Sequence, residues 1–445
     1  MVWPVSDVEL VGTAGAAVTI VDANLTGAVV NIPLGATATI HGVTLRNGQT
    51  TTGVGAGIHN AGTLTLRNST VSGNKCFDGN GGVGILSSGS LTLINSTVSN
   101  NQLVGGYGGG AGIRSYASAT LIDSTVSGNS TTSTPGGGLL AASGSVTLVT
   151  TRIENNVTGS GTFLSGAGLY VRDALSVSLT NCTVSGNIIA GAFGGLSGVG
   201  AGMFVCQTPF SASASTFAGN SASYRAGGIF AYKCNSTELR NCTISDNSGT
   251  GLLTVVAVNS SITVLNCTIA GNASSYDCGG FSHTSPGVAQ VRNTLTAGNS
   301  GNFGVSPDLD CAFPSLGHNL IDSSVGVTGF TIGVLGDQVG VANPGLAPLA
   351  NNGGPTQTRA LSPGRPAINA GDLLVFELFD QRGAPRSAGS AAIGAFESQS
   401  TATYCSAGTS SNGCVALISS SGTASASAAS GFTISVASVP GQRQA

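Results

Sequence analysis

One seven-residue phrase, in variants of N-S-T-V-S-G-N, recurs nine times along this chain at a spacing close to 27 residues. A segment of that length is too short to bury a core by itself, so neighbouring copies must stack and share one. The sequence therefore predicts a solenoid. The copies occupy residues 68–74, 95–101, 123–129, 150–156, 181–187, 214–220, 241–247, 266–272 and 293–299.

Each repeat contains three short extended runs in which apolar residues recur at a spacing of two. In one repeat these runs are Gly57-Ile58, Leu64 to Leu66 and Thr70 to Ser72. A spacing of two places alternate side chains on one face of a strand, and no run is long enough for a helix. We therefore predict an all-β fold, a parallel β-helix with three short strands per coil and coils about 4.8 Å apart.

Asparagine opens the phrase in six copies, where the chain must bend between two strands. Asparagine tolerates the left-handed backbone region and can bond to neighbouring main chain. The column is therefore predicted to form an asparagine ladder along the solenoid. Its members are Asn68, Asn95, Asn181, Asn241, Asn266 and Asn293.

Charge and hydropathy exclude several classes of partner. Charged residues make up 7% of the chain and the formal net charge is -3, so there is no basic stripe for nucleic acid. No apolar run reaches the roughly 20 residues of a membrane span. The segment from Met1 to Pro4 shows no export signal, yet Val18 to Val30 already reads as solenoid strand, so we expect sequence to precede Met1.

The ten cysteines match no zinc module and fall into classes. Cys182, Cys242 and Cys267 take an inward position that holds serine in other repeats, which predicts buried thiols, with the last two on adjacent coils. Two pairs are disulfide candidates: Cys206 with Cys234, and Cys405 with Cys414. Such bridges would indicate an oxidising, extracellular setting.

The composition changes at Leu346, after which the chain is rich in Pro, Gly and Arg. It contains N-G-G-P-T at residues 352–356 and D-Q-R-G-A-P-R at residues 380–386. These strings resemble the C-terminal choice-of-anchor segment, type Q, of bacterial secreted right-handed β-helix proteins. The resemblance implies a right-handed helix and an exported or cell-surface bacterial protein. Four positions depart from the pattern of that family: Arg359, Arg365, Asn369 and Ala392.

These changes in composition divide the chain into a parallel β-helix at residues 1–330, an irregular cap at 331–397 and a Ser/Ala/Gly-rich tail or truncated β module at 398–445. The cap is expected to cover the edges and core of the last coil. In that role its charged residues would be ion-pair and hydrogen-bond partners. They are Asp380, Arg382, Arg386 and Glu397.

Catalytic machinery is sparse in the sequence. Polysaccharide lyases and glycoside hydrolases of β-helix shape need carboxylates on consecutive coils, and no two acids share an outward column here. We predict no catalytic residue and no enzyme, with a polysaccharide lyase or glycoside hydrolase as the alternative. Asp308 and Asp310 could pair as a calcium clip, but a solvated loop is favoured, and no other cofactor is indicated.

One outward column is unusually apolar and aromatic. It runs through His59, Leu86, Arg114, Leu140, Tyr170, Phe204, Phe230 and Leu253. An exposed stripe of this kind needs a partner, and aromatic rings with nearby arginine suit a polysaccharide or another cell-surface component. The alternative is that a loop or the C-terminal segment covers it. The predicted ligand-binding residues are Arg114, Tyr116, Tyr170, Arg172, Phe204, Phe230 and Tyr232.

Overall fold

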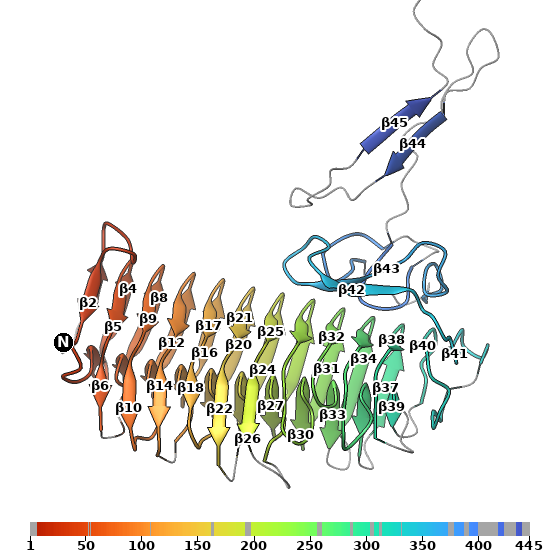
Figure 1. The fold of residues 1–445 in the computed structure, drawn as a ribbon. Helices are drawn as coiled ribbons and strands as arrows, with labels where there is room; N and C mark the ends of the chain where they lie inside the picture. The colour runs from red at the N-terminus through yellow and green to blue at the C-terminus, as the bar shows by residue number, and fades with distance from the viewer. Residues whose placement is uncertain are drawn as a thin grey trace, which may run out of the picture.

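The computed structural model describes residues 7–398 together with strands at 417–421 and 433–437, with gaps in the first range. The gaps are residues 52, 54, 107, 162–163, 192–196, 256–259, 285–287, 303–306, 311–313, 331, 373–377 and 387–390. Throughout the described part the regular elements are all strands. They stack coil upon coil into one elongated solenoid (Figure 1).

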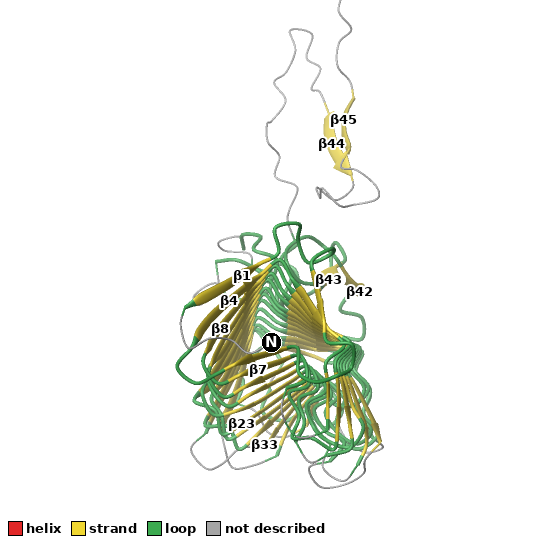
Figure 2. Cartoon of the chain, turned by 90° about the vertical axis from the view of Figure 1, so that its left-hand side faces the viewer, coloured by secondary structure: helices red, strands yellow, loops and turns green. Residues whose placement is uncertain are grey.

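Three long parallel sheets form the walls of the solenoid, and we name them A, B and C. Viewed along the axis, they surround a single interior (Figure 2). Sheet A contains β3 (Val30–Ile32), β7 (Ile58–Asn60), β11 (Ile85–Ser87), β15 (Ile113–Ser115), β19 (Leu139–Ala142), β23 (Leu169–Arg172), β27 (Met203–Cys206), β30 (Ile229–Tyr232), β33 (Leu252–Val255), β36 (Phe281–His283) and β39 (Leu309–Asp310). Sheet B contains β1 (Val8–Val11), β4 (Thr37–His41), β8 (Thr63–Arg67), β12 (Ser90–Ile94), β16 (Ala119–Ile122), β20 (Ser145–Val149), β24 (Ser176–Thr180), β28 (Phe210–Ser213), β31 (Ser236–Arg240), β34 (Ser261–Leu265) and β37 (Val288–Arg292).

Sheet C is formed by the repeated phrase itself, and a short fourth sheet, D, follows it in the first half of the solenoid. Sheet C contains β2 (Ile20–Asp22), β5 (Thr44–Arg46), β9 (Thr70–Ser72), β13 (Thr97–Ser99), β17 (Thr125–Ser127), β21 (Arg152–Glu154), β25 (Thr183–Ser185), β29 (Thr216–Ala218), β32 (Thr243–Ser245), β35 (Thr268–Ala270), β38 (Leu295–Ala297), β40 (Leu320–Ile321) and β41 (Gln338–Val339). Sheet D contains β6 (Gln49–Thr50), β10 (Lys75–Phe77), β14 (Gln102–Val104), β18 (Ser130–Thr131), β22 (Val157–Ser160) and β26 (Ile188–Gly191). The predicted parallel β-helix is confirmed, and sheet D is an addition that the sequence analysis did not anticipate.

The core is a continuous column of inward side chains, as the spacing of two predicted. Leu64 and Leu66 of β8 are fully buried and pair in register with Leu91 and Leu93 of β12. Burial of this kind contributes about 1.5–3 kcal/mol for each large aliphatic side chain. Cys182, Cys242 and Cys267 are also fully buried in this core, which confirms the prediction of buried thiols.

The bend that opens each phrase has the backbone conformation that its asparagine predicted. All nine opening residues have φ between 46° and 55°, including Thr150 and Ala214, which replace asparagine. Asn266 and Asn293 of this column are buried, and its other members are at least partly exposed. Along the column, Asn95 Nδ2 donates to Asn68 Oδ1 at 2.6 Å. The opening residues therefore serve mainly to turn the chain.

The asparagine that closes each phrase forms the continuous ladder, and sequence analysis missed it. From each closing residue to the next, Nδ2 donates to Oδ1 on the following coil at 2.8–3.0 Å. Nearly all of these side chains are fully buried. The closing residues are Asn74, Asn101, Asn129, Asn156, Asn187, Asn220, Asn247, Asn272 and Asn299.

From Asn101 to Asn299, each closing asparagine donates two hydrogen bonds through Nδ2 and accepts two through Oδ1. Asn187 Nδ2 donates to Asn220 Oδ1 at 2.9 Å and to the Ile153 carbonyl at 3.0 Å. Asn187 Oδ1 accepts from both the backbone N–H and Nδ2 of Asn156, each at 3.0 Å. Glycine is required alongside, since a Cβ on Gly168 would lie 2.5 Å from the Gly202 carbonyl oxygen. The ladder thus couples neighbouring coils through buried polar groups whose hydrogen bonds are made within the solenoid.

The C-terminal segment lies along the outside of sheet C, whereas we expected it to cover the last coil. Its hairpin of β42 (Leu346–Ala350) and β43 (Thr358–Leu361) runs above the later coils (Figure 1). The outward hydroxyls of sheet C hold it: Thr216 Oγ1 donates to the Gln357 carbonyl at 2.6 Å. Thr243 Oγ1 donates to Gln381 Oε1 at 2.6 Å. A second hairpin, β44 (Leu417–Ser421) with β45 (Thr433–Ala437), is antiparallel.

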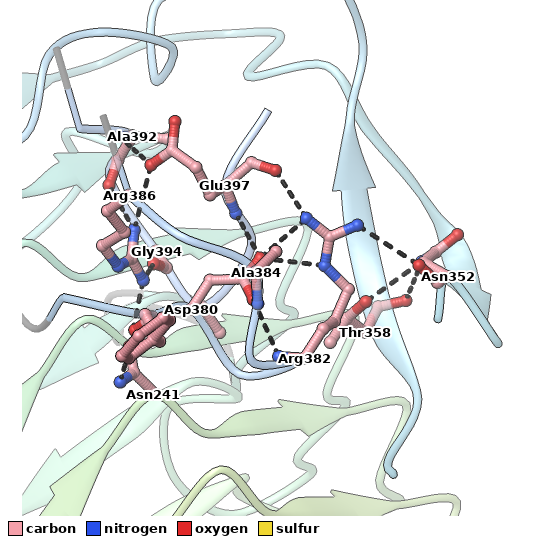
Figure 3. Close-up of polar contacts among 12 residues, drawn as sticks. Asn241, Asn352, Thr358, Asp380, Arg382, Ala384, Arg386, Ala392, Gly394 and Glu397 are labelled. Carbon is pink, nitrogen blue, oxygen red and sulfur yellow. Dashed lines mark hydrogen bonds and ion pairs between the residues drawn. The ribbon is translucent and has the colours of Figure 1, made fainter. Parts of the chain in front are cut away.

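The four charged residues predicted as ion-pair partners do pair with one another (Figure 3). Arg382 contacts Asp380 at 2.7 Å, and Arg386 contacts Glu397 at 3.5 Å with both side chains almost completely buried. Arg386 also reaches the solenoid, donating to Asn241 Oδ1 at 3.0 Å. These charges therefore hold the segment together and fix it to the coils.

Asn187→Ala should lower the free energy of unfolding by about 3 kcal/mol or more, because it leaves several buried donors and acceptors without partners. The matched control is Asn95→Ala at the exposed opening position, where Ala214 shows that alanine fits natively. Urea unfolding followed by circular dichroism measures both. Equal losses in the two variants would contradict a structural role for the ladder.

Candidate ligand-binding site

The outward column of sheet A is aligned as predicted, but its central members are not exposed. Strand pairing places Leu140, Tyr170, Phe204, Phe230 and Leu253 on consecutive coils. Phe204 retains 2% of its exposure and Phe230 4%, so the expectation of an exposed stripe is wrong at its centre.

Loops that return from sheet C toward sheet A cover this column. Val199 and Ala226 of these loops are fully buried against Phe204 and Phe230. This covered arrangement is the alternative that the sequence offers to an exposed stripe. At the two ends of the aromatic set, Tyr170 and Tyr232 are only half-buried.

The four rings contact one another in sequence, and we call them the aromatic cluster. Tyr170 stacks on Phe204 with ring centroids 5.1 Å apart. Phe204 meets Phe230 edge-on at 5.4 Å, and Phe230 lies 5.8 Å from Tyr232. Pairs at such distances stabilise by about 0.5–1.5 kcal/mol beyond the area they bury. The cluster is therefore a packed set of four rings with a half-buried tyrosine at each end.

A polar hollow of about 470 Å³, here called the corner hollow, lies where sheet A turns into sheet B. It is lined by Asp173, Ala174, Gln207, Lys233 and Asn235. Three of these, Asp173, Gln207 and Lys233, have φ of 51–53° and so mark the turn on successive coils.

Charged groups connect the corner hollow with the aromatic cluster. Lys233 Nζ lies 5.2 Å from the Tyr232 ring centroid, and Arg172 Nε lies 2.9 Å from Asp173 Oδ2. The hydrogen bond that Arg172 donates to Asp173 raises the pKa of Arg172, while burial raises the pKa of Tyr170. At neutral pH the site therefore offers a cationic guanidinium and a neutral phenol, both hydrogen-bond donors.

The remaining two predicted binding residues lie elsewhere. Arg114 is on β15, two strands from Tyr170, and its guanidinium lies 4.8 Å from the Tyr116 ring centroid. Desolvation by burial lowers the pKa of Arg114. Leu140, on the intervening strand, separates this pair from the aromatic cluster. The structure thus groups five of the seven predicted residues and leaves Arg114 with Tyr116.

The predicted bridge between Cys206 and Cys234 is not formed; both are free thiols. Cys206 aligns with Tyr232 on the outer face, whereas Cys234 points into the core, so the two are not equivalent positions. Burial raises the pKa of Cys234 to about 12, which leaves its thiol protonated. Cys405 and Cys414 lie outside the described residues.

Asp308 is neither part of a calcium clip with Asp310 nor a residue of a solvated loop. It is fully buried and ends the ladder, with Oδ1 accepting from Asn299 Nδ2 at 2.8 Å and Oδ2 from the Ser323 N–H at 3.0 Å. Burial and the neighbouring Asp322 carboxyl raise the pKa of Asp308 to about 8. Asp310 instead accepts from Ser282 Oγ at 3.4 Å. In the described part of the chain, no three acidic, histidine or cysteine side chains are placed to hold a metal ion.

Two further hollows, each of about 450 Å³, were not predicted. The first, the sheet B hollow, lies on the outer face of that sheet and is lined by residues that include Ser178, Ser211 and Glu238. The second, the cap cleft, lies between the solenoid and the C-terminal segment, with Asn181 on one side and Phe379 on the other. The signal in sequence for the sheet B hollow was the change from threonine to serine at its outward positions. The cap cleft has no local signal, because it joins residues about 200 positions apart.

Comparison with known proteins identifies one family. The model of the "Right handed beta helix region" matches residues 28–199 and 197–308, which is more than half of the chain. Searches of curated proteins and of solved structures find no match to this chain. Among the described residues no helix is long and apolar enough to cross a membrane.

Asp308→Asn should flatten the pH dependence of stability. The folded-state pKa of about 8 lies above the ordinary value of 3.8, so between about pH 4 and pH 8 the folded protein holds a proton that the unfolded chain releases. Stability therefore falls as pH rises through this window, by up to about 1.4 kcal/mol per pH unit. The asparagine variant loses the hydrogen bond from the Ser323 N–H at every pH. Because its amide does not titrate, the stability of the variant does not fall between about pH 4 and pH 8 on this account.

Thermal melting at pH 4.5 and pH 8.5 measures this difference. Asp310→Asn, two residues away, is the control and should keep the wild-type dependence on pH. If Asp308→Asn also kept it, the buried carboxyl pair would not be the source.

Proposed function

The chain belongs to the right handed beta helix family, and on that premise we propose that it is an exported bacterial surface protein that binds polysaccharide without cleaving it. The observation that carries this proposal is the aromatic cluster, whose Tyr232 contacts Lys233 of the corner hollow. Export and attachment to the cell surface are further parts of the proposal, and the resemblance of residues 346–397 to a choice-of-anchor segment supports them.

The chemistry of the site suits a sugar ring. Apolar faces of sugars stack on aromatic planes, and their hydroxyls need donors and acceptors at the rim. Tyr170 and Tyr232 offer the planes, while Arg172, Gln207 and Lys233 offer polar groups on consecutive coils. Phe204 and Phe230, which lie between the two tyrosines in the cluster, are covered and hold them in place.

A polysaccharide lyase or glycoside hydrolase is the alternative, and Glu238 in the sheet B hollow is the observation that favours it. Hydrolases place two carboxylates about the scissile bond. Among the described residues that line this hollow Glu238 is the one carboxylate, and it pairs with Arg240. New reducing ends or unsaturated products from acidic polysaccharides would establish the enzyme, whereas retention without products supports binding.

Tyr232→Ala should weaken binding of the preferred polysaccharide about tenfold, because it removes a stacking surface worth about 1.4 kcal/mol. Affinity electrophoresis through gels containing polygalacturonate, alginate, xylan, mixed-linkage β-glucan or glycol chitin measures retention. Circular dichroism checks that the variant remains folded.

Tyr116→Ala is the matched control, because Tyr116 follows β15 at the register position that Tyr232 occupies on β30. It should be retained like the parent protein. An equal loss of retention in the two variants would show that the aromatic cluster is not the binding site. If the parent protein is not retained by any polymer of the panel, polysaccharide binding is contradicted for these polymers.

A further inference from the structure

The three hollows of the described molecule that were introduced above share the same three coils. The corner hollow takes Asp173, Gln207 and Lys233 from the turns between sheets A and B. The cap cleft takes Asn181, Ala214 and Asn241 from the turns between sheets B and C. The sheet B hollow uses the strands that connect these turns, β24, β28 and β31, and extends to Ser261 and Thr263 of β34.

Along each coil the three hollows follow one another with only short intervals of sequence. In order from corner hollow to sheet B hollow to cap cleft, the first coil contributes Ala174, Ser176 to Ser178, then Asn181. The second contributes Gln207, Pro209 to Ser211, then Ala214, and the third contributes Asn235, Ser236 to Arg240, then Asn241. The linings of the hollows therefore follow one another across sheet B, perpendicular to the solenoid axis, and we call this succession of hollows the track.

Small side chains explain why the track crosses sheet B at these coils. One outward column of sheet B contains Thr65, Thr92, Thr120 and Thr147 on earlier coils and changes to Ser178 and Ser211 here. Serine lacks the methyl group of threonine, so the outer surface of sheet B is lower at Ser178 and Ser211 than on the earlier coils. Glu238, paired with Arg240, follows on the next coil, and the hollow continues past it to Thr263 of β34.

The far end of the track, like its start, places an aromatic ring beside polar side chains. In the cap cleft, Phe379 is 54% exposed and Leu378 is 68% exposed, although both are large and apolar. Across the cleft lies the Asn181 side chain, and Asn241 Nδ2 donates to the Phe379 carbonyl at 3.1 Å, which fixes the position of that residue. An apolar ring opposite an amide is a second place for a sugar ring to stack and bond.

We propose that a polysaccharide chain binds across the coils, from the aromatic cluster through the sheet B hollow to Phe379 of the C-terminal segment. This inference rests on the proposed function and specifies its ligand as an extended polymer. From residue 173 to residue 181, of which β24 covers 176–180, the backbone spans at most about 26 Å at roughly 3.3 Å per residue. Short oligosaccharides fill only part of that length, so affinity increases with chain length.

Ser178→Trp and Ser211→Trp test the track, because each places a bulky ring in the middle of it at a surface position. Thr92→Trp is the matched control, since strand pairing through β16 and β20 puts Thr92 in the same outward column as Ser178. The probe is the polymer of the panel that the parent protein retains most strongly, with its oligosaccharides from the dimer upward. Calorimetry measures the dissociation constants.

We expect both serine variants and Phe379→Ala to bind the polymer about tenfold more weakly, Thr92→Trp to bind like the parent, and affinity to rise with oligosaccharide length. Parent affinity in both serine variants, with Tyr232→Ala still impaired, would overturn the transverse track and leave the proposed function intact. If no polymer binds the parent protein, the proposed function and this inference both fail.

Discussion

The structure depends on a buried hydrogen bond that is repeated from coil to coil. Each closing asparagine donates to the next, and its own acceptor oxygen takes two bonds from the coil before. A slip of one residue would leave these groups buried without partners, at about 1–3 kcal/mol each. Apolar burial favours stacking in general but does not select one register, whereas the ladder does.

That register determines the outer surface as well as the core. Because successive coils align residue by residue, outward side chains at equivalent positions form columns. The aromatic cluster, the hydroxyl columns of sheet C and the three hollows are all consequences of this alignment. The C-terminal segment uses one such column for its own attachment, through Thr216, Thr243 and Thr268. The same mechanism that stacks the coils therefore also builds the surface on which we place the ligand.

The sequence predicted what depends on local periodicity. A spacing of two in Leu64 and Leu66 gives the strand face, and the recurring phrase gives the coil, so the parallel β-helix and the left-handed bends at residues such as Asn68 followed directly. It did not predict what depends on distant segments. Phe204 points outward as its register requires, but only the folded loops that carry Val199 and Ala226 determine that it is covered. Cys206 pairs with Tyr232 and so lies two register positions from Cys234. Because the coils differ in loop length, the sequence alone does not show this offset.

Crystallography of the protein with a bound oligosaccharide tests the account most directly, because it shows both the location and the direction of the ligand. The account predicts density for sugar rings that begins against Tyr232, crosses Ser211 and ends against Phe379, perpendicular to the axis of the solenoid. Density that runs along the axis, or that lies on another face of the molecule, would contradict it.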